Sequence, residues 1–231
     1  MPNPIYTYGQ TQTTGLQHKV LQNTYWLLGL TLIPTAIGAL VGLNMAFGFM
    51  MTNPMLSTLL MLAVVYGLFY AIEANRYSVT GVYLLLLLTF VLGVMLGPLL
   101  QYTLAMRHGP QLIAMAAGGT GVIFLGLSFI ANTTKRDFTN LAGFLTVGAL
   151  VLMVASIANI FIRLPLFQLV LCGGFMLFSS LMILFNVNQI VRGGETNYIS
   201  ATLSLYMNIY NIFVSLLQLL GAFGGGGNDR R

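Results

Sequence analysis

Within the apolar segments of this chain, the side chains best suited to chemistry are uncharged amides and hydroxyls. Most of them lie near the C-terminal end of the chain. Ser204, Asn208, Asn211 and Ser215 recur at i, i+4, i+7 and i+11, and Gln218 continues the series. This spacing places all of them on one face of a helix. Such a stripe would be costly against lipid, so we expect it to face the interior of a helix bundle.

The two preceding apolar stretches carry polar residues at compatible spacing. They are Ser179, Asn186 and Gln189 in one stretch, and Ser156, Asn159 and Arg163 in the other. With the stripe of the last stretch they predict a polar seam among the last three helices, and "polar seam" denotes these residues below. Two interpretations stay open: interhelical hydrogen bonds that only hold the helices together, or a path for a ligand or an ion.

Groups that could support other chemistry are absent from the sequence. No apolar stretch has an Asp, Glu, Lys, Arg or His in its interior, although proton-coupled transporters usually need such a group within the membrane. Glu73 and Arg76 form an i, i+3 pair that we expect at the membrane edge. No nucleophile–base pair, HExxH pattern or phosphate loop is present, so we assign no catalytic residue and expect no enzyme.

The residues that most often bind metals are also scarce. The single cysteine, Cys172, lies in an apolar run and is interpreted as a small buried hydrophobic residue. The two histidines, His18 and His108, lie near segment ends. We therefore expect neither a metal site nor a cofactor.

Composition decides the class of protein. Of 231 residues, 57% are hydrophobic and 6% are charged, whereas a soluble domain carries about a quarter charged residues. Membrane lipids must therefore cover most of the surface. The nine Lys and Arg residues are too few for a nucleic-acid surface, and they are better interpreted as determinants of membrane topology.

The ionisable residues divide the sequence into charge-free stretches long enough to cross a membrane. A spanning helix needs about 20 apolar residues, and this predicts an all-α membrane protein with seven transmembrane helices in one compact bundle. The expected spans are residues 24–47, 55–72, 79–102, 111–131, 138–161, 165–190 and 201–223.

Small residues four apart predict where helices approach closely. Gly38 with Gly42, and Gly93 with Gly97, have this spacing, which allows two backbones to come into contact. Pro98 and Pro34 lie inside spans, and we expect them to bend their helices.

Two terminal segments flank the spans. Residues 1–20 are polar and almost uncharged, and we expect a flexible cytoplasmic tail there, followed by a transmembrane domain over 21–223. Residues 224–231 predict a short Gly-rich tail.

Basic residues set the orientation. An N-terminus inside the cell places five of them on the cytoplasmic side: Lys19, Arg76, Lys135, Arg136 and Arg192. The loops on the other side then hold two, Arg107 and Arg163. Arg230 and Arg231 oppose this assignment, but late charges usually weigh less, so we expect the N-terminus inside and the C-terminus outside.

Four sequence motifs carry a resemblance to a known family. Residues 184–199 read Leu-Phe-Asn-Val-Asn-Gln-Ile-Val-Arg-Gly-Gly-Glu-Thr-Asn-Tyr-Ile, and 203–213 read Leu-Ser-Leu-Tyr-Met-Asn-Ile-Tyr-Asn-Ile-Phe. Residues 18–25 (His-Lys-Val-Leu-Gln-Asn-Thr-Tyr) and 96–99 (Leu-Gly-Pro-Leu) precede them. This pattern resembles the Bax inhibitor-1 family of seven-span proteins, also called transmembrane BAX inhibitor motif proteins, and in particular its bacterial YccA-like branch. Its most distinctive part is the loop motif Arg192, Gly193, Gly194, Glu195, Thr196, Asn197 and Tyr198.

The resemblance implies a protein of the bacterial inner membrane with a protease as its partner. YccA-like members bind and modulate FtsH, the membrane-anchored ATP-dependent protease, and are degraded by it. A protease that pulls its substrates needs an unstructured handle, which the N-terminal tail would supply. Its candidate residues are Gln10, Thr11, Gln12, Thr13, Thr14 and Gln17.

The wider family implies an alternative function, a pH-sensitive calcium leak channel. Its channel members resemble one another in a pair of interior aspartates on the sixth and seventh spans, and the matching positions here are Asn186 and Asn208. Asparagine has no titratable proton and no charge to attract Ca²⁺. A carboxylate latch therefore cannot operate with this pair, while a pore lined by amides stays open as an alternative.

Overall fold

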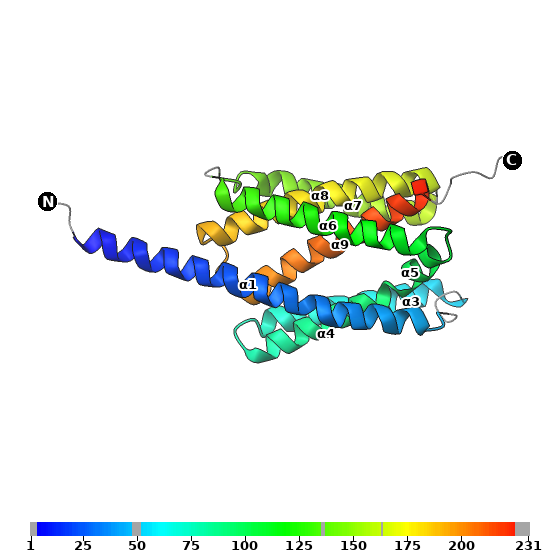
Figure 1. The fold of residues 1–231 in the computed structure, drawn as a ribbon, viewed down its shortest axis with the longest axis horizontal. Helices are drawn as coiled ribbons and strands as arrows, with labels where there is room; N and C mark the ends of the chain where they lie inside the picture. The colour runs from blue at the N-terminus through cyan, green and yellow to red at the C-terminus, as the bar shows by residue number, and fades with distance from the viewer. Residues whose placement is uncertain (1–3, 48–51, 135–136, 163, 225–231) are drawn as a thin grey trace. The chain divides into compact units, whose positions relative to one another are not determined.

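A computed structural model describes residues 4–47, 52–134, 137–162 and 164–224, with side chains from residue 17 onward except Pro54. Helices account for nearly all of these residues, and no strand occurs among them (Figure 1). The helices are α1 (Pro4–Asn44), α3 (Pro54–Ala74), α4 (Val79–Met95), α5 (Gly97–Leu104), α6 (Gly109–Thr133), α7 (Leu141–Ile162), α8 (Pro165–Arg192) and α9 (Tyr198–Gly224).

Seven helical stretches are long and apolar enough to span a membrane, which confirms the predicted fold class. Six follow the expected spans closely, and the first, expected at residues 24–47, falls mostly within α1. Their outward surfaces are apolar: Phe161 is 80% exposed and Leu166 is 75% exposed. In α7, Leu145 alone is buried among the described residues. Side chains of this kind need lipid as their solvent.

The expected third span consists of two helices. α4 ends at Met95 and α5 begins at Gly97, with Leu96 between them. Pro98 explains the break, because proline lacks the N–H that would donate to the carbonyl four residues earlier. The bend predicted at this proline is therefore confirmed as a helix break, whereas Pro34 lies inside the continuous α1.

The N-terminal segment differs from the expected tail, because α1 begins at Pro4 and its backbone is helical across residues 10–17. Extending an existing span by one residue requires no new nucleation, and the segment 5–20 contains no proline to stop the extension. The flexibility of the segment stays a prediction. The predicted C-terminal tail, 225–231, lies outside the described residues.

The chain divides into two compact units. One unit comprises Gln22–Tyr102 and Asn197–Leu203. In it α3 packs against α4, and α1 approaches α4 closely. A Cβ atom on Gly38 would overlap the carbonyl oxygen of Phe90, and one on Gly93 would overlap that of Thr35. Gly42 likewise meets the Val94 carbonyl and Gly97. The two glycine pairs predicted from their spacing thus lie at one backbone-to-backbone contact.

The other unit comprises Met1–Leu21, Thr103–Thr196 and Ser204–Arg231. In it α8 packs against both α6 and α7. Most of α9 also belongs to this unit, where Gly119 of α6 leaves room for the side chain of Leu216. This unit contains all described members of the polar seam.

Candidate functional site

The loop motif begins where α8 ends. Gly193 takes the left-handed conformation with φ 79°, which favours glycine because other residues carry a Cβ. The Gly194 N–H donates to the carbonyl of Gln189 at 2.8 Å, so the turn closes on the last turn of the helix. The side chain of Gln17 lies against Gly193 and would collide with a Cβ there.

An exposed ionic cluster lies beside this turn. Asp137 accepts hydrogen bonds from the Thr139 hydroxyl at 2.6 Å and from the Thr139 N–H at 2.9 Å, and it pairs with Arg192 at 3.9 Å. The bonds from Thr139 hold the pKa of the Asp137 carboxyl below its usual value, and the Arg192 charge acts in the same direction. Gln189 donates to the Thr139 hydroxyl at 3.2 Å. The cluster ties the segment before α7 to the end of α8.

The second half of the loop motif belongs to the other unit. Asn197 caps α9, because its Oδ1 accepts from the N–H groups of Ile199 at 2.9 Å and Ser200 at 3.2 Å. Its Nδ2 donates to the Arg76 carbonyl at 2.8 Å. Ser200 also donates to Glu73 at 3.2 Å, and Glu73 pairs with Arg76 at 3.4 Å. The predicted Glu73–Arg76 pair thus helps to position the start of α9.

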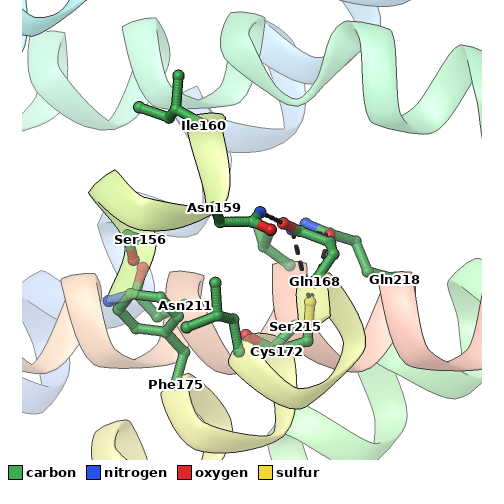
Figure 2. Close-up of a pocket in the computed structure, with 11 residues that line it drawn as sticks. Ser156, Asn159, Ile160, Gln168, Cys172, Phe175, Asn211, Ser215 and Gln218 are labelled. Carbon is green, nitrogen blue, oxygen red and sulfur yellow. Dashed lines mark hydrogen bonds between the residues drawn. The ribbon is translucent and has the colours of Figure 1, made fainter. Parts of the chain in front are cut away.

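A pocket of about 380 Å³ lies among α7, α8 and α9 within one unit. Seven of its lining side chains are polar and uncharged: Ser156, Asn159, Gln168, Cys172, Asn211, Ser215 and Gln218. Figure 2 shows Asn159, Gln168 and Gln218 pointing toward one another, with Cys172 below Gln168. Ile160, Leu171, Phe175 and Val214 complete the wall.

Hydrogen bonds connect one side of this pocket. Asn159 Nδ2 donates to Gln168 Oε1, and Gln168 Nε2 donates to Gln218 Oε1 at 3.0 Å. The Cys172 thiol donates to the same Gln218 oxygen at 3.3 Å. The chain of amides joins three membrane-spanning helices, which is the expected role of polar side chains in a bundle.

Some buried polar atoms in this unit lack a partner among the described residues. They are Asn159 Oδ1, Asn186 Nδ2, Ser179 Oγ and Ser128 Oγ. A buried polar atom without a hydrogen bond costs about 1–3 kcal/mol. Asn159 Oδ1 is the member of this group that belongs to a pocket-lining residue.

The structure brings only part of the polar seam together at the pocket. Asn211 and Ser215 line it, whereas Ser204 is exposed, contrary to the prediction that it faces the interior. Asn208 is buried, but its Nδ2 donates to the Ser204 carbonyl in its own helix at 2.7 Å. Gln189 lies at the ionic cluster instead. The spacing of residues predicts which of them share a helix face. It does not predict which positions along that face a neighbouring helix covers.

Arg163, expected in the seam, lies outside the described residues, as do Lys135 and Arg136. The side chains of Gln10, Thr11, Gln12, Thr13 and Thr14 are also outside the described part of the structure. Their predicted roles stay predictions.

Two residues of the pocket, Gln168 and Cys172, were not predicted from the sequence to belong to a polar site. Gln168 makes the central hydrogen bonds of the pocket, and Cys172, buried as predicted, also donates a hydrogen bond there. Their spacing of i and i+4 near the start of an apolar span was the available signal, since both then share a helix face. Among the residues with described structure, no group of three His, Cys, Asp or Glu side chains could hold a metal ion.

One family model and several known proteins are similar to this chain over most of its length. A model of the family described as inhibitor of apoptosis-promoting Bax1 matches residues 17–225. An uncharacterised protein of Neisseria meningitidis serogroup A is 43% identical over 227 residues, which cover 97% of this chain and 99% of that protein. The Escherichia coli K12 protein named modulator of FtsH protease YccA is 43% identical over 204 residues, covering 88% and 90%. An uncharacterised membrane protein of Vibrio cholerae is 40% identical over 222 residues, covering 96% and 97%.

Proposed function

This chain belongs to the family of the inhibitor of apoptosis-promoting Bax1, and we propose that it binds and modulates an FtsH-type membrane protease in the bacterial inner membrane. The observation that carries the proposal is the similarity to the Escherichia coli protein named a modulator of FtsH protease, which extends over most of both chains. In this proposal the protein acts as a regulator and a substrate of the protease, and not as an enzyme.

The proposed orientation puts the N-terminus on the protease side of the membrane. The excess of basic residues on that side supports it, and an even number of crossings separates the start of α1 from the α3–α4, α6–α7 and α8–α9 connections. The C-terminus then lies on the opposite side. The ionic clusters of Glu73 with Arg76 and of Asp137 with Arg192 both fall in connections on the protease side.

The N-terminal segment is the proposed handle. Extended, its roughly 20 residues would reach about 60–70 Å, whereas a helix over residues 4–17 covers only about 20 Å. Because α1 is helical from Pro4, the protease would first unwind this segment and separate Gln17 from Gly193. Degradation should therefore depend on the length of the segment as well as on its presence.

Co-purification and turnover test this function together. Tagged full-length protein, extracted in mild detergent from cells with active protease, should retain the FtsH-type protease through purification. Deletion of residues 10–17 should slow its degradation several-fold, while a Gly-Ser replacement of the same length should restore most of the rate. Absence of the protease from the purified sample, together with unchanged turnover of the deletion variant, would count against both the partner and the handle.

A cation leak is the second candidate function, and one observation favours it. Asn186 Nδ2 and Ser179 Oγ, both on α8, are buried without partners among the described residues, and a hydrated path would satisfy them. Ion flux through liposomes that contain the purified protein distinguishes this candidate from the first. A Ca²⁺ flux that changes with Asn186→Leu would support the leak. A Ca²⁺ flux no greater than that of protein-free liposomes would rule it out.

A further inference from the structure

The pocket among α7, α8 and α9 lies close to one face of the membrane. Asn159 is three residues before the end of α7, and Gln168 is three residues after the start of α8. At a rise of 1.5 Å per residue, each is about 5 Å from its helix end. The 28 residues of α8 span about 42 Å, which exceeds the roughly 30 Å of the hydrocarbon layer. The pocket is therefore within reach of water and lipid headgroups.

The wall of the pocket excludes charged occupants. None of the lining residues carries a charge. An ion placed there would lose its hydration without gaining a counter-ion, which is the costliest form of burial. The neutral wall also offers no carboxylate to a divalent cation, which prefers anionic oxygen ligands.

The same wall disfavours a purely apolar occupant. Asn159 Oδ1 is buried and accepts no hydrogen bond among the described residues. The Asn211 amide lines the pocket and offers both a donor and an acceptor, and Ser156 keeps acceptor capacity while its hydroxyl donates to the Leu152 carbonyl at 2.7 Å. A hydrocarbon group would leave these polar atoms without hydrogen bonds.

We propose that this pocket is a binding site for a small neutral group that both donates and accepts hydrogen bonds, a hydroxyl or an amide. The group can come from a dissolved solute or from the glycerol headgroup of a membrane lipid. Asn159 Oδ1 accepts from it, and the Asn211 amide provides the complementary donor. The site is independent of the proposed protease partner, because it rests only on α7, α8 and α9.

The single cysteine of the chain makes the selectivity of the pocket measurable. The Cys172 thiol lies in the wall of the pocket. Because the chain has a single cysteine, this is the only thiol that an alkyl iodide can modify. The sulfur, as thiolate after loss of its proton to water, forms a C–S bond to the CH₂ carbon, and iodide leaves with the electron pair of the C–I bond. Iodoacetamide and iodoacetate share this reaction and differ in that the first is neutral and the second is an anion.

The test compares the two reagents on wild-type protein in lipid nanodiscs, with mass spectrometry of the intact chain. The ratio of the iodoacetamide rate to the iodoacetate rate should be about tenfold higher in the folded protein than after denaturation, a factor that one neutral hydrogen bond can supply. An unchanged ratio would overturn the proposal. So would a thiol that stays unmodified in the folded protein at times when the denatured protein is fully alkylated.

A pair of variants separates the pocket from general effects of folding. Asn159→Leu removes the free acceptor and should bring the ratio close to its denatured value, and the milder Ser215→Ala should lower it in part. The matched control is Asn132→Leu on α6, which is exposed and outside the pocket, and it should keep the wild-type ratio. Equal ratios in Asn159→Leu, Ser215→Ala and the control would contradict the assigned wall.

The source of the group is distinguished by the composition of the nanodisc. Slower alkylation by iodoacetamide in phosphatidylglycerol-containing discs than in pure phosphatidylcholine discs identifies the lipid headgroup as the occupant. Equal rates in both discs, with slowing by free glycerol, identify a dissolved solute. Rates that neither phosphatidylglycerol nor glycerol changes would overturn the binding site.

Discussion

The glycine contact between α1 and α4 and the amide pocket among α7, α8 and α9 hold helices together in opposite ways. At the first, Gly38 and Gly93 bring backbone against backbone, so that even a methyl group would collide with a carbonyl. At the second, Asn159, Gln168 and Gln218 connect helices through hydrogen bonds and leave a pocket of about 380 Å³.

The difference shows what each kind of contact permits. Lipid removes the hydrophobic force between helices, so association depends on close packing or on polar contacts. Close packing leaves no space, and it can therefore only support the fold. Side-chain amides reach across a gap, and the same gap gives room for a ligand.

The largest expected effect comes from filling the glycine contact. Gly38→Ala places a Cβ against the Phe90 carbonyl, and overpacking of this kind costs about 1–3 kcal/mol. Thermal unfolding in detergent micelles, followed by circular dichroism, should show a clear fall in the midpoint. The matched control is Gly29→Ala in the same helix, where nothing lies within 4 Å of the added Cβ. Equal midpoints for the two variants would show that α1 and α4 do not pack as tightly as described.

A smaller effect is expected from the amide pocket. Gln168→Leu removes the acceptor of Asn159 and the donor to Gln218. Polar contacts between membrane helices average about 0.6 kcal/mol and reach about 1.7, so we expect a loss of about 1 kcal/mol. The same unfolding assay measures it, with Gln111→Leu, an exposed position on α6, as the control. A loss as large as that of Gly38→Ala would abolish the distinction between the two kinds of contact.

The smallest effect is a dependence of stability on pH at the ionic cluster. The pKa of Asp137 is lower in the folded protein than its usual value, so the charged carboxyl stabilises the fold above that usual value, and this contribution is lost as the pH falls through the lowered pKa. The pair is exposed, and the effect should be slight. Unfolding midpoints between about pH 6 and pH 3 should fall more for wild type than for Asp137→Asn. Parallel curves would show that Thr139 and Arg192 do not act on this carboxyl.

The sequence predicted the parts of the fold that depend on local composition. Charge-free stretches located the seven spans, and the spacing of Gly38 with Gly42 and of Gly93 with Gly97 located a close contact. These predictions succeed because lipid restricts a spanning segment to a helix and because only small residues allow two backbones to touch.

The candidate site was predicted only in part, since it depends on how helices rotate and cover one another. Asn211 and Ser215 line the pocket, but Ser204 on the same predicted face is exposed. Asn208 finds its hydrogen bond within its own helix, and no spacing rule could reveal that choice. Gln168 was missed because its partner at i+4, Cys172, was interpreted as a hydrophobic residue, so the pair was not counted as a polar face.

The cap of α9 sets an order in time for assembly. Asn197 donates to the Arg76 carbonyl across 121 positions of the chain, and Thr202 donates to the Thr24 carbonyl across 178. The ribosome therefore synthesises six spans before it reaches residues 197–203, which complete the unit that begins at Gln22. Until the seventh span is synthesised, the carbonyls of Arg76 and Thr24 lack these two donors. A chain released before residue 197 would therefore lack both donors and the whole C-terminal part of this unit.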